Sequence, residues 1–211
     1  MLPLVSRMSE LEHNLLSLYR TATAEDTSKG LAWYPSAHQI VCEWAETYRL
    51  PIATVACVVS ALSPQCEWSR NLIVADDLLA GRAPSVGGPL PSNIVKAERI
   101  LQDRAVVTLP YFPQGPKVCT FAANLAGNYT VATVDTHALQ AALADVQATL
   151  TLKWARYNVV SQCYVNVARC VGLQPAHFQA ILWHTWKRLY PWGRKQKLRQ
   201  QWYVVGMEDR W

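Results

Sequence analysis

The sequence predicts an all-α protein that folds as one compact domain or as two packed helical subdomains. Hydrophobic residues make up 51% of the 211 residues and charged residues 17%, which is too apolar for a disordered chain and sufficient for a sizeable core. Apolar residues recur at helical spacing along most of the chain, and the alternation typical of half-buried strands is almost absent. The length fits one compact unit of this kind.

Each expected helix has a start or stop signal of its own. Capping boxes, serine caps and prolines at the first helical position mark starts, and a glycine after the last turn marks an end. The expected helices are about 9–18 with the Ser9–Glu12 capping box, 36–48 capped by Ser36, 51–62 opened by Pro51 and stopped by Pro64, 68–79 with Gly81 behind it, 92–101 capped by Ser92, 117–126 ending at Gly127, 136–144, 154–170 and 175–189.

The most apolar run, Leu50–Leu62, predicts a buried helix and not a membrane span. It has 13 residues, whereas a span needs roughly 20. The first residues show no basic segment ahead of an apolar stretch, so we expect no secretory signal. The expected location is the reducing cytoplasm, in association with the nucleoid.

The cysteines and histidines indicate no metal site. The six cysteines form no C-x-x-C pair, and in a cytoplasmic chain we interpret them as small core residues. The five histidines show no ligand spacing. The sequence therefore predicts neither a structural zinc nor another bound metal at these residues.

The basic excess lies near the C-terminus. The chain has 20 Lys and Arg against 15 Asp and Glu, and six of the basic residues lie between Lys187 and Arg199 with no acidic residue among them. The remainder has 14 basic and 15 acidic residues, a net charge of −1. A basic tail with nearby aromatic residues suggests a polyanion partner, although a solvated helix would show the same charge. The expected contacts in the tail, residues 187–211, are Arg194, Lys195 and Lys197.

Three segments of the middle region carry the chemistry. Ser63-Pro64-Gln65 comes first, Leu109–Lys117 holds a Pro- and Gly-containing loop that leads into a helix at Lys117, and Val134–His137 follows. A helix, such a loop and a second helix form a hairpin whose backbone N–H groups suit a phosphate. Asp135 lies 18 residues after Lys117 and opens another helix. Taken singly, the lysine could be a surface residue and the aspartate an N-cap.

Together these segments resemble the helix-hairpin-helix DNA glycosylase superfamily, the endonuclease III-like enzymes of base excision repair. The resemblance covers about residues 51–140 and rests on Val58–Gln65 with Asn71, Lys96–Glu98, Leu109–Pro110, Lys117 and Val134–His137. The chain departs from the family pattern in two ways. Its hairpin is two residues longer and keeps only Gly115, and it lacks the four closely spaced cysteines of the iron–sulfur loop.

The resemblance implies roles for Asp135 and Lys117. Asp135 would correspond to the essential carboxylate, which stabilises the oxocarbenium-like transition state of N-glycosidic cleavage. Lys117 would correspond to the nucleophile of the bifunctional members, which attack C1′ and form a Schiff base. Two alternatives stay open: Lys117 contacts a phosphate while Asp135 activates water, or Asp135 is only an N-cap.

The resemblance also implies how DNA would be held. Gln65 would enter the helix in place of the flipped base, and Gln114 and Gly115 would lie at the hairpin. Candidate pocket residues are Trp68, Tyr111 and His137. The implied arrangement places residues 51–140, with the helix-hairpin-helix unit, across a cleft from 1–50 plus 141–190.

The expected function is therefore a DNA glycosylase that flips out and removes a damaged or modified base from double-stranded DNA. It would act as a monomer without an iron–sulfur cluster, and the resemblance allows a monovalent cation at the hairpin. Its role would be base excision repair or defence against phage with modified DNA. The alternative is a non-catalytic DNA-binding module that uses the hairpin and the basic tail.

Overall fold

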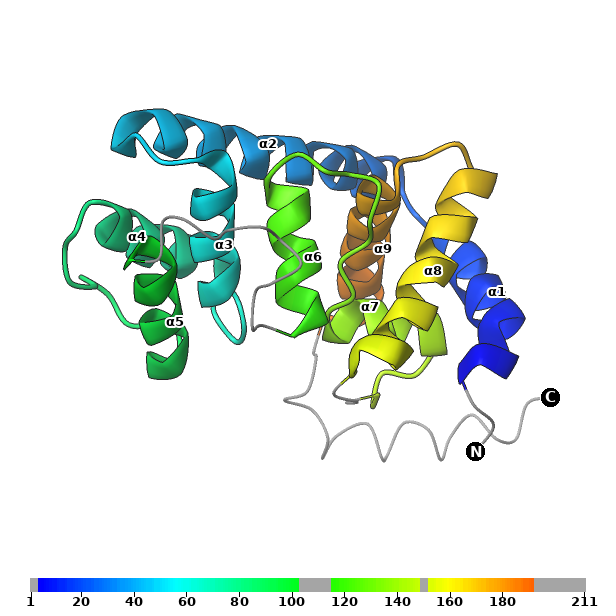
Figure 1. The fold of residues 1–211 in the computed structure, drawn as a ribbon. Coiled ribbons are helices and arrows are strands. Elements are labelled where there is room, and N and C mark those ends of the chain that lie inside the picture. The colour runs from blue at the N-terminus through cyan, green and yellow to red at the C-terminus, as the bar shows by residue number, and fades with distance from the viewer. Residues whose placement is uncertain (1–3, 103–114, 149–151, 192–211) are drawn as a thin grey trace.

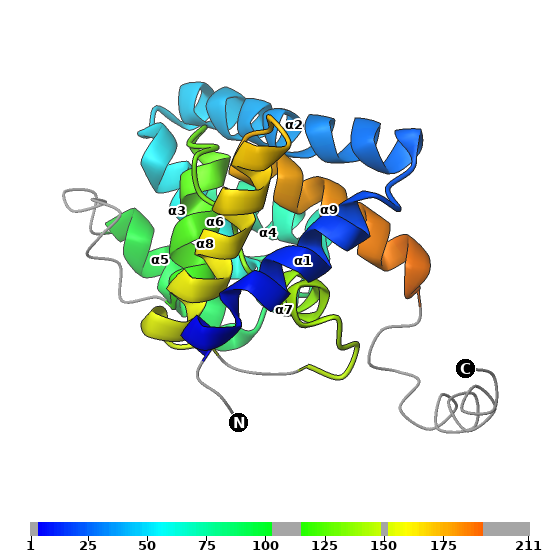
Figure 2. The same ribbon diagram turned by 90° about the vertical axis from the view of Figure 1, so that its right-hand side faces the viewer.

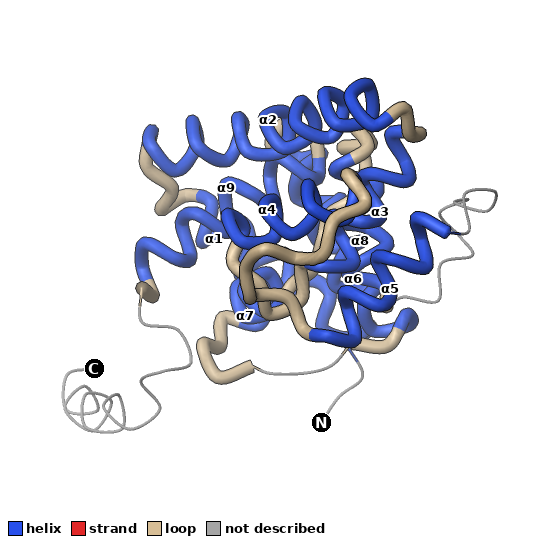
Figure 3. The backbone as a smooth tube through the Cα atoms, turned by 90° about the vertical axis from the view of Figure 1, so that its left-hand side faces the viewer, coloured by secondary structure: helices blue, strands red, loops and turns tan. Residues whose placement is uncertain are grey.

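The computed structural model describes residues 4–102, 115–148 and 152–191, and this part of the chain contains helices and no strand (Figures 1 and 3). The all-α prediction is confirmed. The elements are η1 (Leu4–Arg7), α1 (Met8–Tyr19), α2 (Ala24–Tyr48), α3 (Ile52–Leu62), α4 (Trp68–Leu79), α5 (Pro91–Gln102), α6 (Pro116–Leu125), α7 (Thr136–Leu143), α8 (Trp154–Cys170) and α9 (Pro175–Leu189).

Most expected helix boundaries agree with the structure to within a residue. The expected helices at 68–79, 154–170 and 175–189 coincide with α4, α8 and α9. Pro51 precedes α3 as expected, and all nine residues from Thr54 to Leu62 are buried. Local signals mark several of these ends: Pro175 starts α9, and Gly81 and Gly172 follow α4 and α8.

The start of α2 was predicted wrongly. The helix begins at Ala24 and not at Ser36, and it continues through the exposed Pro35. Its true start is a capping box, in which the Thr23 Oγ1 accepts a hydrogen bond from the Asp26 N–H (3.1 Å) and the Asp26 carboxylate accepts one from the Thr23 N–H (3.0 Å). These two bonds and the packing of the helix outweigh the local cost of a proline.

The expected serine caps of α1 and α5 were also wrong. α1 begins at Met8, so Ser9 lies inside its first turn, and Arg7 at the N-cap makes no side-chain cap bond. α5 begins at Pro91, which places Ser92 within the helix. In α5 the proline occupies the position that it favours at a helix start.

The buried apolar side chains form two clusters. The first cluster draws on α2 to α6, and the second on α1, α7 and α8. α9 contributes to both, with Ala176 and Ala180 in the first cluster and Phe178, Leu182 and Trp186 in the second. The clusters thus group α2 with α3–α6, and α7 with α1 and α8, whereas the sequence-based division ran at residues 50 and 140.

α2 lies along α9, and this close pair joins the two clusters (Figures 1 and 2). Gly30 makes the approach possible, since a Cβ there would lie 2.5 Å from the backbone of Ile181. At one end of the pair, the Arg188 guanidinium donates to the Asp26 carboxylate at 2.8 Å. α9 therefore has a fixed position between the two clusters.

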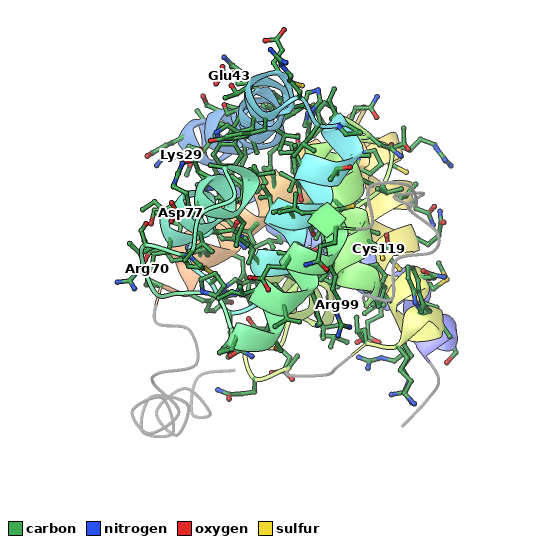
Figure 4. All side chains as sticks on the ribbon, turned by 60° about the vertical axis from the view of Figure 1, so that its left-hand side comes forward. Lys29, Glu43, Arg70, Asp77, Arg99 and Cys119 are labelled. Atoms are coloured by element: carbon green, nitrogen blue, oxygen red, sulfur yellow. The ribbon has the colours of Figure 1, made fainter. Side chains whose placement is uncertain are left out.

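Charged side chains such as Lys29, Glu43 and Arg70 point away from this core (Figure 4). The cysteine prediction holds only in part. Cys57 and Cys163 are buried, three others are half-buried, and Cys170 at the end of α8 is exposed. None of the described helices is both long enough and apolar enough to cross a membrane.

Candidate active site

Lys117 lies in the first turn of α6 and is bonded to the end of α3. Its Nζ donates a hydrogen bond to the Ser63 Oγ at 2.7 Å, and that hydroxyl donates to the Ser60 carbonyl at 2.8 Å. The Ser60 hydroxyl in turn donates to the Val118 carbonyl at 2.7 Å. These bonds fix the start of α6 against the last turn of α3, and they hold the lysine side chain at this junction.

The surroundings of Lys117 disfavour its charged form. The residue is half-buried, and burial of the amine lowers the pKa of Lys117 below its ordinary value, while the negative charge of Asp135 acts in the opposite direction. The Nζ lies 5.0 Å from the centre of the Phe121 ring, a cation–π contact that favours the charged form and so acts in the same direction as Asp135. Because burial dominates, the neutral and nucleophilic amine is present at lower pH than in an ordinary lysine.

Asp135 is the N-cap of α7, and both of its carboxylate oxygens accept hydrogen bonds. Oδ1 accepts from the Ala138 N–H at 2.8 Å, and Oδ2 accepts from the Trp183 indole N–H at 3.2 Å. The carboxylate is half-buried. One bond comes from its own helix and the other from α9, so the orientation of the carboxylate is fixed from two directions.

Tyr157 of α8 connects the surroundings of the two residues. Its hydroxyl accepts a hydrogen bond from the Val134 N–H at 2.8 Å and bonds to the hydroxyl of Thr120. Thr120 lies one turn after Lys117 in α6, and Val134 directly precedes Asp135. Burial raises the pKa of Tyr157 to about 12, so this phenol is neutral at physiological pH and holds α6 and the start of α7 together.

Two of the three candidate pocket residues have contacts that lead to this pair. Trp68 is half-buried, with ring centres 5.3 Å from Trp33 and 6.3 Å from Phe121. Phe121 is the ring that faces the Lys117 amine. His137 lies on the other side, with its ring centre 6.2 Å from that of Trp183, the partner of Asp135.

Gln65 lies in the turn between α3 and α4, two residues after Ser63. Its side chain is exposed, and its φ is +60°. A non-glycine residue in this left-handed region is uncommon and carries some strain. Gly115, the N-cap of α6, is also exposed and has an ordinary φ of −61°. Gln65 lies two residues after Ser63 and Gly115 two residues before Lys117, so each is close in sequence to one partner of the Lys117–Ser63 hydrogen bond.

The other predicted contacts lie outside the described residues. They are the hairpin residues Tyr111 and Gln114 and the tail residues Arg194, Lys195 and Lys197. The loop of the hairpin, where a monovalent cation was predicted, also lies outside the described residues. Among the residues that the structure does describe, no group of three or more His, Cys, Asp or Glu side chains could hold a metal ion.

Two residues that hold this site had no predicted role. Ser63 belongs to the Ser63–Gln65 segment, but nothing in its position predicted a hydrogen bond to a lysine 54 residues away. Trp183 is 48 residues from Asp135, and tryptophan at helical spacing ordinarily indicates core packing. Such contacts depend on how helices pack, which local patterns do not encode.

The chain has a family but no match among characterised proteins. Neither the curated proteins nor the solved structures compared with it contain a match. The model of one protein family covers residues 5–189, which include all nine α-helices of the described chain and every residue of the site above. The chain belongs to this family, described as a family of unknown function (DUF7178).

Proposed function

We propose that the protein is a DNA glycosylase in which Lys117 and Asp135 act on one N-glycosidic bond. One observation carries the proposal: a lysine whose pKa is lowered by burial lies within the electrostatic reach of an aspartate held by two N–H donors. A perturbed lysine beside a fixed carboxylate is typical of a reaction centre. The helix-hairpin-helix resemblance supplies the reaction class.

Asp135 stabilises the positive charge that develops on the sugar. As the bond between base and C1′ lengthens, the deoxyribose becomes oxocarbenium-like, and a nearby carboxylate lowers the energy of that state. Its two hydrogen bonds matter because a pre-oriented carboxylate needs no reorganisation during the reaction. The Ala138 and Trp183 N–H groups supply this orientation.

Lys117 is the nucleophile in this proposal. The neutral amine forms a bond from Nζ to C1′, and the base leaves with the electrons of the glycosidic bond and takes up a proton. The attacking nitrogen then loses one proton, the bond from C1′ to the ring oxygen breaks as that oxygen takes up a proton and becomes a hydroxyl, and a protonated imine links enzyme and sugar. Loss of a C2′ proton from this imine expels the 3′ phosphate and cuts the strand. Burial of Lys117 favours the first step, since only the neutral amine attacks.

DNA binding in this proposal uses both ends of the site. The segment from α5 to α6 would form the helix-hairpin-helix unit on the phosphate backbone, and the flipped base would enter a cleft near the Trp33–Trp68–Phe121 aromatic cluster. Gln65 would fill the gap in the duplex. Its exposed position and left-handed backbone conformation support this role.

A panel of duplexes, each with a different oxidised, deaminated, alkylated or enlarged base, tests the proposal. Base release is scored as abasic sites under single-turnover conditions. The wild-type protein should release at least one of these bases, and Asp135→Asn should slow release by about 100-fold or more. Asparagine is as good an N-cap as aspartate, so the variant should keep α7.

Asp145→Asn provides the matched control. Asp145 is an exposed carboxylate just beyond the other end of α7, where it accepts a hydrogen bond from the Gln147 N–H at 2.8 Å. This variant should release bases at the wild-type rate. Binding to every duplex without release of any base would contradict catalysis and would favour the DNA-binding module. Full activity of Asp135→Asn would remove Asp135 from the mechanism.

A further inference from the structure

The start of α8 carries an exposed aromatic side chain and two exposed cations close to it in sequence. Trp154 is 50% exposed, an unusual fraction for the largest apolar side chain. Lys153 and Arg156 beside it are also exposed, and neither forms an ion pair with any other described residue. These three residues are called the α8 surface below.

The α8 surface lies next to the candidate active site. Tyr157 follows Arg156 directly, and its hydroxyl holds Val134 and Thr120, which lie beside Asp135 and Lys117. Lys153 is four residues, about one helical turn, from Tyr157, a rise of about 6 Å. In Figure 1 the first turn of α8 lies at the same end of the molecule as α7 and the start of α6.

The stretch of chain that contains this surface carries charges of one sign. Between Asp145 and Glu208 the sequence contains nine Lys and Arg and no Asp or Glu. α8 and α9 both lie in this stretch and carry only basic charges. A polyanion that approaches the start of α8 therefore meets no carboxylate from either helix.

We propose that the α8 surface binds the DNA strand that flanks the reacting nucleotide. Lys153 and Arg156 contact its phosphates, and Trp154 packs on the sugar or base of a nucleotide unstacked beside the flipped one. Cations that contact the backbone, together with an aromatic side chain on which a base can stack, form the common arrangement for an unpaired strand. The choice of DNA as the partner rests on the proposed function, whereas the position of the surface does not.

Affinity measurements test this surface without any need for catalysis. The probe is a short fluorescent duplex that contains a tetrahydrofuran abasic-site analogue, titrated with full-length protein at several salt concentrations. Trp154→Ala should weaken binding about 5- to 100-fold, since stacking of one base on an aromatic ring has that effect. Lys153→Ala/Arg156→Ala should also weaken binding and reduce the slope of log K against log salt by about two.

Arg169→Ala is the matched control. Arg169 is exposed, belongs to the same helix and lies 13 residues from Arg156, a distance of about 20 Å along the axis. Its removal should change the affinity less than twofold. All of these side chains are exposed, so thermal unfolding midpoints should agree with the wild-type value.

Two results would overturn the proposal. One is unchanged affinity in both α8-surface variants; the other is an equal loss in Arg169→Ala, which would mean that general charge and not this surface binds DNA. Neither outcome depends on base release. A protein that binds the duplex through the α8 surface but releases no base would keep this inference and refute the glycosylase.

Discussion

Lys117 and Asp135 are held in opposite ways. Among the described residues, Lys117 has one side-chain hydrogen-bond partner, the Ser63 hydroxyl, and burial acts against its charge. Asp135 has two N–H donors, from Ala138 and Trp183, and each donates to a different carboxylate oxygen. The first environment favours loss of a proton from the amine, whereas the second keeps a carboxylate in one orientation.

The difference follows from where each residue lies. Phe121, beside Lys117, belongs to the cluster of α2–α6, and Val134, which precedes Asp135, belongs to the cluster of α1, α7 and α8. Each cluster thus supplies one member of the pair, and Tyr157 and α9 bridge the two. A site at such a junction can combine an apolar environment that favours a neutral amine with a hydrogen-bonded environment that holds a carboxylate.

Removal of the indole N–H from Trp183 should have the larger effect on this arrangement. Trp183→Phe keeps an aromatic ring but leaves Asp135 Oδ2 without its 3.2 Å donor. A hydrogen bond to a charged group contributes about 1.5–3 kcal/mol, so single-turnover base release should fall about 10-fold or more. Affinity for the abasic-site duplex should be unchanged, because the indole positions the carboxylate and does not bind DNA.

Trp186→Phe is the control for that experiment. Trp186 lies on the same helix and donates its indole N–H to the Gln140 side chain at 3.3 Å, not to Asp135. Its replacement should lower stability without a comparable loss of rate once the protein is folded. Equal losses of rate in the two variants would mean that Trp183 acts only through the packing of α9.

Removal of the Ser63 hydroxyl should have a smaller effect, visible mainly in the pH dependence. The hydroxyl oxygen accepts a hydrogen bond from the Lys117 ammonium and so favours its charged form. Ser63→Ala should therefore lower the pKa of Lys117 further. Because the neutral amine reacts, the rise of the rate with pH should move to lower pH, while the plateau should change only a few-fold.

The pH profile of Ser161→Ala is the comparison. The Ser161 hydroxyl donates to the Ala132 carbonyl at 3.1 Å and does not contact the lysine. Its profile should overlay that of the wild type. A shift of the Ser63→Ala profile to higher pH would show that the hydroxyl stabilises the neutral amine. That result would contradict the claim that the Ser63 hydroxyl favours the charged form of Lys117.

Local sequence signals predicted most helix boundaries. They failed where tertiary packing determines which of two similar signals starts a helix. Proline and glycine at the ends of α4, α6 and α9 gave their boundaries, since these residues restrict the backbone whatever surrounds them. The capping patterns at Ser9 and at Thr23 look alike in sequence, yet only Thr23 caps a helix. Burial of the first half of α2 against α9 carries that helix through Pro35, and no local pattern contains this information.

The sequence predicted only those residues of the candidate site that belong to motifs read along the chain. Lys117 and Asp135 were predicted from the family resemblance, through the order and spacing of their motifs, and in the structure each has a specific hydrogen-bond partner. Ser63 is hydrogen-bonded to Lys117 and Trp183 to Asp135, but these two partners come from the end of α3 and from α9. Their roles depend on how helices far apart in the sequence cross. In the same way, the sequence pattern did not distinguish the exposed Trp154 from a core tryptophan.

Borohydride trapping tests the joint action of Lys117 and Asp135 most directly. Reduction of the imine during reaction with a base-containing substrate should join wild-type protein and DNA in a stable secondary amine. Lys117→Ala should give no adduct, and Asp135→Asn should give little because the base must leave first. An adduct that persists in Lys117→Ala, or base release by wild-type protein without any adduct, would contradict the account.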